Sequence, residues 1–113
     1  MFHVAYRALI LLSFLKPLNL HAAKPLLFMT LIEFYGQGCP HCIAMDALVE
    51  KLEHDLGVVV EKFEVWNSEE NARKKEKFDN HLCGGVPFFY NTKTKAHLCG
   101  AVEYDVLKKW ASD

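Results

Sequence analysis

The segment Cys39-Pro40-His41-Cys42 constrains this chain most, because it lies between a strand-like run and a helical pattern. The preceding residues 26–35 are almost continuously apolar, which is typical of a strand buried on both faces. Residues 36–38 (Gly-Gln-Gly) interrupt this run, and residues 40–56 then carry apolar side chains at helical spacing. The pattern predicts a strand, a tight turn and a helix, with Cys39 at the helix N-terminus.

The rest of the chain continues the alternation of strands and helices. β-branched and aromatic residues predict a strand over 58–66, and Asn67 with Glu70 resembles a capping box that opens a helix ending near residue 82. Two short strands, 87–91 and 96–99, form a hairpin, and a helix over 102–111 follows. The order β-α-β-α-β-β-α implies a parallel first pair and an antiparallel last pair of strands. We therefore expect an α/β fold with a four-stranded mixed sheet and helices on both faces.

The position of Cys39 favours thiol–disulfide chemistry. Free backbone N–H groups and the positive end of the helix dipole stabilise a thiolate at a helix N-terminus. Cys42 lies one turn further on, close enough to bridge, so Cys39 is expected as the exposed nucleophile and Cys42 as the resolving thiol. A positive charge on His41 would lower the pKa of Cys39 and favour donation of a disulfide. The alternatives are half of a zinc site, although no second CxxC follows, and a purely structural bridge.

The stretch LIEFYGQGCPHC (residues 31–42) resembles the active-site region of the thioredoxin and protein disulfide isomerase families. The CPHC tetrapeptide is similar to that of DsbA-type bacterial oxidases, and Gly85-Val86-Pro87 matches the cis-proline segment of the superfamily. The resemblance covers residues 26–111. It implies a thioredoxin-like three-layer sandwich and a protein disulfide oxidoreductase that acts as an oxidase or isomerase.

The resemblance also implies roles for individual residues. Glu33 corresponds to a buried acid that exchanges a proton with Cys42, and a carboxyl in a buried strand should indeed have a raised pKa. The alternative for Glu33 is a solvated or capped acid on a strand edge. Val86-Pro87 would be a cis peptide whose backbone pairs with an extended substrate. Pro40, Val86 and Pro87 are the expected substrate-binding residues.

Two departures from the family pattern and a likeness to another family leave other functions open. Gly38 replaces the tryptophan that usually precedes the first cysteine, which predicts a more open and less aromatic surface. We expect no inserted helical domain, so the resemblance does not imply substrate selection of the DsbA type. The CPxC motif also resembles glutaredoxins, which use glutathione, although Gln37-Gly38 stands where that family has a basic residue. A module that binds extended peptides without catalysis is the alternative from another functional class.

Cys83 and Cys99 have three possible roles. Cys99 is expected opposite Pro87 in the hairpin, and the flexible Gly84-Gly85 would let Cys83 fold back onto it. A second disulfide, two separate buried thiols, and metal binding or intermolecular pairing all fit this placement.

Residues 1–23 have the layout of a secretory signal peptide. Arg7 precedes an apolar run over 8–15, and the small residues Ala22 and Ala23 supply a cleavage site. Residues 24–113 would then form one thioredoxin-like domain in the secretory pathway, whether the ER lumen, a periplasm-like space or the exterior.

Composition narrows the expected partners. The net charge of −1 does not favour nucleic acid, and no apolar run is long enough for a stable membrane span. We expect no metal and no cofactor beyond the redox-active disulfide. The expected partners of a monomer are proteins with thiols or disulfides and a redox protein that recycles the CxxC pair.

Overall fold

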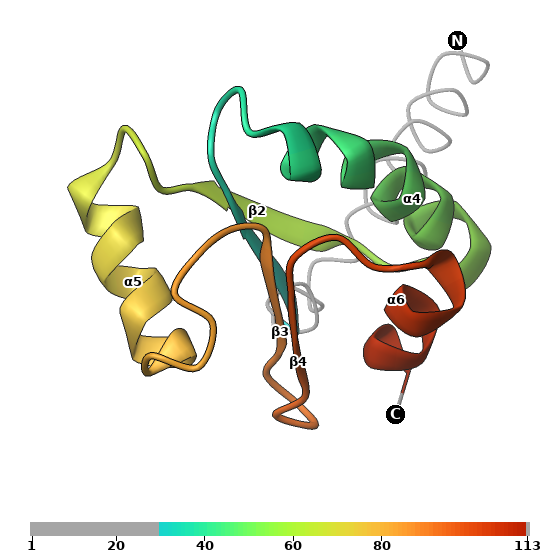
Figure 1. The fold of residues 1–113 in the computed structure, drawn as a ribbon. Coiled ribbons are helices and arrows are strands. Elements are labelled where there is room, and N and C mark those ends of the chain that lie inside the picture. The colour runs from blue at the N-terminus through green and yellow to red at the C-terminus, as the bar shows by residue number, and fades with distance from the viewer. Residues whose placement is uncertain (1–29, 113) are drawn as a thin grey trace, which may run out of the picture.

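The computed structural model describes residues 30–112, which form four strands and three helices (Figure 1). The elements are β1 (Leu31–Tyr35), α4 (Pro40–Leu56), β2 (Val60–Glu64), α5 (Glu69–Asp79), β3 (Phe88–Asn91), β4 (His97–Cys99) and α6 (Tyr104–Ala111). This is the element order that the sequence predicts. The predicted signal peptide (1–23), the domain start at residue 24 and residues 26–29 of the predicted first strand lie outside the described residues.

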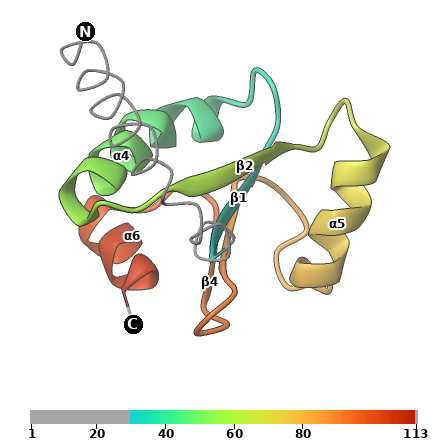
Figure 2. The ribbon, with the colours of Figure 1, turned by 180° about the vertical axis from the view of Figure 1, so that it is seen from behind.

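The four strands form one mixed sheet in the order β2-β1-β3-β4. β1 pairs in parallel with β2, and the crossover between them contains α4. β3 pairs antiparallel with both β1 and β4. Helices α4 and α6 lie on one face of the sheet and α5 lies on the other (Figures 1 and 2). The expected α/β class and mixed sheet are therefore confirmed.

Each face of the sheet has its own apolar cluster, because alternate side chains of a strand point to opposite faces. On the side of α4 and α6 the cluster contains Leu31, Met45, Val49, Leu52, Val60, Phe89, Leu107 and Trp110. On the side of α5, Ile32, Phe34 and Phe88 form a second buried cluster. The Phe34 ring lies 5.6 Å from that of Phe63 and 6.2 Å from that of Phe88. Glu33 shares the face of Leu31 and so lies beneath α4.

Helix α4 has the bounds that its sequence predicts. Pro40 occupies its first turn, and Met45, Val49 and Leu52 are buried against the sheet. Gly57 ends the helix in the left-handed region at φ 66°, where it donates its N–H to the Glu53 carbonyl. The start of α4 positions both cysteines of the motif, because Cys39 is its N-cap and Cys42 lies in its first turn.

Helix α5 differs from its prediction at both ends. Ser68 is the N-cap, with its Oγ accepting from the Asn71 N–H at 3.1 Å, whereas Asn67 donates its own backbone N–H to Glu64. The helix ends at Asp79 because Asn80 adopts a left-handed φ of 48°. The predicted strand over 58–66 is also shorter: β2 ends at Glu64, and Trp66 lies beyond it on the surface.

Candidate functional site

The turn before α4 holds Cys39 at the N-cap position. Its N–H donates to the Gly36 carbonyl at 3.0 Å, and Gly38 in the same turn has a φ of 83°. Cys39 Sγ accepts from the Cys42 N–H at 3.2 Å, so a free N–H of the first helical turn points at this sulfur. The predicted position of Cys39 is confirmed.

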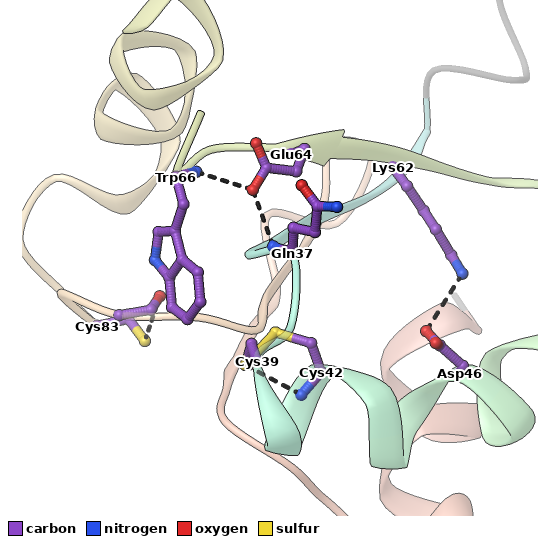
Figure 3. The surroundings of a disulfide bond; sticks show 9 residues. Gln37, Cys39, Cys42, Asp46, Lys62, Glu64, Trp66 and Cys83 are labelled. Atoms are coloured by element: carbon purple, nitrogen blue, oxygen red, sulfur yellow. Dashed lines mark hydrogen bonds and ion pairs between the residues drawn. A yellow bond between two sulfur atoms is a disulfide. The ribbon is translucent and has the colours of Figure 1, made fainter. Parts of the chain in front are cut away.

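Cys39 and Cys42 form a disulfide, with their Cα atoms 5.2 Å apart (Figure 3). Both residues are buried: Cys39 is 4% exposed and Cys42 is 2% exposed. The expectation that Cys39 is an exposed nucleophile is therefore wrong for this structure.

Trp66 covers the turn that leads to Cys39. Its side chain is largely exposed, and its indole ring packs flat on the backbone of Gly36, where a Cβ would lie 2.3 Å from the ring. Figure 3 shows the ring between the Cys83 segment and the turn that carries the disulfide. The expectation of a less aromatic surface is thus wrong, because a tryptophan from the end of β2 supplies the ring. The signal was available: β2 runs parallel to β1, so residues after both strands meet at one end of the sheet.

Glu64 joins the end of β2 to the same turn. Its carboxylate accepts from the backbone N–H groups of Gln37 at 2.8 Å and Trp66 at 3.1 Å (Figure 3). It also accepts from the Asn67 N–H at 2.8 Å. These hydrogen bonds hold the pKa of Glu64 below its usual range, and the bond from the Gln37 N–H has the largest effect. Glu64 therefore fixes Trp66 against the turn before Cys39. Sequence analysis missed this residue, since nothing local in the chain marks a carboxylate that bridges two loops.

Glu33 is a buried acid on the face of the sheet covered by α4. It is 1% exposed, and neither of its oxygens has a hydrogen-bond partner among the described residues. Burial raises its pKa to about 7, an effect that the Lys62 ammonium opposes and that Asp46 reinforces. The alternative of a solvated edge acid is thereby excluded. The raised pKa lets Glu33 exchange a proton near neutral pH.

A cavity of about 550 Å³ lies between α4 and β2, on the face of the sheet to which Glu33 belongs. It is lined by Ile43, Asp46, Ala47, Glu50, Glu53 and Lys62. Lys62 is the register partner of Glu33 across the β1–β2 ladder, and its Nζ lies 3.6 Å from a carboxylate oxygen of Asp46 (Figure 3). Lys62, Asp46 and Glu53, the charged groups that modify the pKa which burial gives Glu33, therefore line a cavity that solvent can enter.

The Val86–Pro87 peptide bond is cis, as the resemblance implies. Pro87 is buried and Val86 is half-buried. Phe34 faces Phe88 across the β1–β3 ladder, so continuing this register places Pro87 beside Tyr35 and Val86 beside Gly36. The cis-proline segment thus lies next to the turn that carries Cys39. Pro40 and His41 lie exposed in the first turn of α4, at the same end of the sheet.

Cys83 and Cys99 form a second disulfide, with their Cα atoms 5.5 Å apart. Of the three roles open from the sequence, the structure selects this one. Cys99 faces Phe88 across the β3–β4 ladder, one residue from the predicted position opposite Pro87. The bond ties the loop before the cis-proline to the edge strand.

Comparison with models of known protein families and with curated proteins finds no match to this chain. Among residues 30–112, no group of three or more His, Cys, Asp or Glu side chains is placed to hold a metal ion. No helix in this part of the chain has the length and apolar character needed to cross a membrane. The geometry of the site therefore carries the functional argument.

Proposed function

We propose that this chain is a thioredoxin-like thiol–disulfide oxidoreductase that exchanges disulfides with protein thiols through Cys39 and Cys42. The observation that carries the proposal is the CxxC disulfide at the N-terminus of α4, where Cys39 Sγ accepts the Cys42 N–H. In the reduced protein the same N–H and the helix dipole would favour a thiolate on Cys39. A stable Cys39 thiolate makes the disulfide easier to reduce, which supports the oxidase or isomerase direction.

The proposed reaction has two exchange steps. A substrate thiolate attacks Cys39 Sγ, so that a mixed disulfide forms and Cys42 leaves as a thiolate. A second substrate thiolate then attacks the substrate sulfur of the mixed disulfide and releases Cys39, which leaves the substrate oxidised and the CxxC pair reduced. A separate redox partner would reoxidise the pair.

Glu33 is the proposed proton donor to Cys42. A group with a pKa of about 7 holds a proton in part of the population at neutral pH and can give it to the leaving thiolate. Solvent in the cavity lined by Asp46, Glu53 and Lys62 would return a proton to Glu33, and these three charged groups all act on the Glu33 carboxyl. His41 would add positive charge near Cys39, and the Val86 backbone would pair with the substrate chain beside Pro40 and Pro87.

Two disulfides in one small chain fit an oxidising compartment, which supports the proposed secretory location. The protein would act there as a monomer on protein substrates and would need no cofactor beyond the CxxC disulfide.

The test is disulfide transfer from the oxidised chain to a reduced, unfolded protein, followed by alkylation and mass spectrometry. We expect the chain to lose the Cys39–Cys42 bond as the substrate gains one. The Cys39→Ser/Cys42→Ser variant is the negative control, and the Cys83→Ser/Cys99→Ser variant should still transfer. No transfer above the negative control would refute the proposal.

A peptide-binding module is the second candidate, because Cys39 and Cys42 are buried whereas Trp66, which packs on the turn before Cys39, is 58% exposed. Such a module would hold apolar extended segments against the indole ring. Binding of an unfolded protein that survives in the Cys39→Ser/Cys42→Ser variant, together with absent disulfide transfer, would favour it.

A further inference from the structure

The two disulfides differ in their access to solvent. Cys39 and Cys42 are 4% and 2% exposed, whereas Cys99 is exposed and Cys83 is half-buried. An exposed disulfide is more accessible to an external thiol than a buried one, and exposed disulfides are among the labile ones. By this criterion Cys83–Cys99 is the bond that a small thiol in solution reaches first.

The exposed bond lies at the end of the sheet that carries the CxxC pair. Cys99 in β4 faces Phe88 in β3, and Phe88 faces Phe34 near the end of β1. Cys99 therefore lies at the end of the sheet where β1 leads into the turn before Cys39. The residue after Cys99, Gly100, donates its N–H to the Pro87 carbonyl at 2.8 Å. The bond therefore closes a loop that contains the cis-proline segment.

The backbone around each sulfur is held independently of the bond. Asp79 accepts from the backbone N–H groups of Cys83 at 2.5 Å and Gly84 at 2.9 Å, and it pairs with the Lys75 ammonium. Cys99 is held by the β3–β4 ladder. The two sulfurs would thus stay adjacent after reduction and could form the bond again, as a reversible exchange site requires.

We propose that Cys83–Cys99 is a second thiol–disulfide exchange site, which small external thiols of the glutathione type open at Cys99, the more exposed of its two residues. An external thiolate attacks Cys99 Sγ, the Cys83–Cys99 bond breaks, and Cys83 leaves as a thiolate that takes a proton from solvent. A second external thiol then attacks the mixed disulfide, which gives an oxidised external disulfide and the Cys99 thiol. Two external thiols thereby supply the two electrons that the protein disulfide gains.

Opening of this bond would loosen the short segment between Gly84, which Asp79 still holds, and Pro87. At Gly85 a Cβ would meet nothing within 4 Å, so there is open space beside this part of the segment. If the proposed function holds, the same segment pairs with substrate at Val86, and the second site would control substrate binding. The chemistry of the second site itself does not depend on that function.

The test uses the full chain with Cys39→Ser/Cys42→Ser, which leaves one disulfide and removes any contribution from the CxxC pair. The oxidised variant is incubated with reduced glutathione, quenched with acid, alkylated and analysed by mass spectrometry. We expect the folded protein to open within about tenfold of the rate measured after unfolding in urea. A bond that opens only in urea would overturn the proposal and make Cys83–Cys99 a structural bridge.

Two further variants test which sulfur is attacked. Cys83→Ser or Cys99→Ser is added to the same background, and the remaining thiol is treated with oxidised glutathione. We expect Cys99 to be modified at least about fivefold faster than Cys83, because it is the more exposed. The reverse order would overturn the assignment of Cys99.

Amide hydrogen exchange tests the loosening of the loop. The Gly100 amide donates to the Pro87 carbonyl. In the Cys39→Ser/Cys42→Ser variant this amide should exchange about tenfold faster when Cys83–Cys99 is reduced than when it is oxidised. The Val65 amide, which donates to Tyr35 on the other side of the sheet, is the matched control and should not change. If the Gly100 amide exchanged at the same rate in both states, the Cys83–Cys99 bond would not control the cis-proline segment. Because these readouts need no disulfide transfer by Cys39, their failure is distinct from failure of the proposed function.

Discussion

Trp66 lies flat on Gly36, so closely that a Cβ on Gly36 would come within 2.3 Å of a ring carbon. Gly36 is the residue whose carbonyl accepts the N–H of Cys39. The ring therefore rests on the same turn that positions the Cys39 sulfur. This contact gives the site an aromatic wall although no tryptophan precedes the first cysteine.

Gly36→Ala should destabilise the fold by about 1–3 kcal/mol, because the new methyl group cannot coexist with the indole ring in its present place. Urea unfolding followed by circular dichroism measures the loss. Gly85→Ala is the matched control, since open space surrounds that position and its φ is not positive. The control should change stability by less than about 1 kcal/mol. Equal effects of the two substitutions would contradict the described contact.

Glu64→Gln should loosen the link between β2 and the turn before Cys39. An amide accepts N–H bonds less strongly than a carboxylate does, and Glu64 accepts three of them. The amides of Gln37, Trp66 and Asn67 should exchange at least about tenfold faster in the variant, as followed by NMR. Glu50→Gln, on the exposed face of α4, should leave these amides unchanged. Protection that persists in Glu64→Gln would show that other contacts hold the turn.

Glu33→Gln should change how stability depends on pH. The folded pKa of about 7 lies above the ordinary 4.5, so between these values the folded state keeps a proton that the unfolded state releases. Wild-type stability should therefore fall as the pH rises from 4.5 to 7, by about 3 kcal/mol at 1.36 kcal/mol per pH unit. The variant lacks this titration. Urea unfolding from pH 4.5 to 8 measures the free energy of unfolding of both proteins. The variant should gain stability relative to wild type as the pH rises through this window. A difference in unfolding free energy that does not change with pH would contradict a raised pKa of Glu33.

Asp79→Asn should cost about 3 kcal/mol, because it leaves the Lys75 ammonium buried without its carboxylate. Burial alone would raise the pKa of Asp79, but the bonds from Lys75, Gly84 and Cys83 outweigh it and lower the pKa to about 2. A lowered pKa stabilises the fold above pH 3.8, and this stabilisation is lost as the pH falls toward 2. Glu69→Gln removes an exposed ion pair with Arg73 from the same helix and should cost less than about 1 kcal/mol. Urea unfolding at pH 7 compares the two variants, and similar losses would argue against the buried pair.

Local patterns predicted the features that depend on neighbours in the chain. Pro40, the apolar spacing and Gly57 predicted both ends of α4, and with them the position of Cys39 at the N-cap. Glu33 could be recognised as buried because it interrupts an apolar strand. The cis bond before Pro87 was predicted from the family resemblance, because the sequence alone does not decide whether a proline at the start of a strand is cis or trans.

Features that depend on contacts between distant segments could not be predicted in the same way. The pairing of Cys83 with Cys99 depends on where Asp79 fixes the loop after α5, and the sequence left three roles open. The sequence places Trp66 in a strand, because an aromatic residue after β-branched neighbours fits a strand equally well. Asn67 fits the cap of α5 by its spacing to Glu70, but its backbone N–H donates to Glu64 and Ser68 is the cap.

The most direct test of the proposed function is the redox equilibrium of Cys39–Cys42 with glutathione at pH 7, in the chain that carries Cys83→Ser/Cys99→Ser. These two substitutions leave a single disulfide, so the measured potential belongs to the CxxC pair. If the N-terminus of α4 stabilises the Cys39 thiolate, the potential will lie well above about −270 mV, the value typical of a reducing thioredoxin. A potential at or below that value would contradict the proposed oxidase or isomerase and indicate a reductase or a structural bridge.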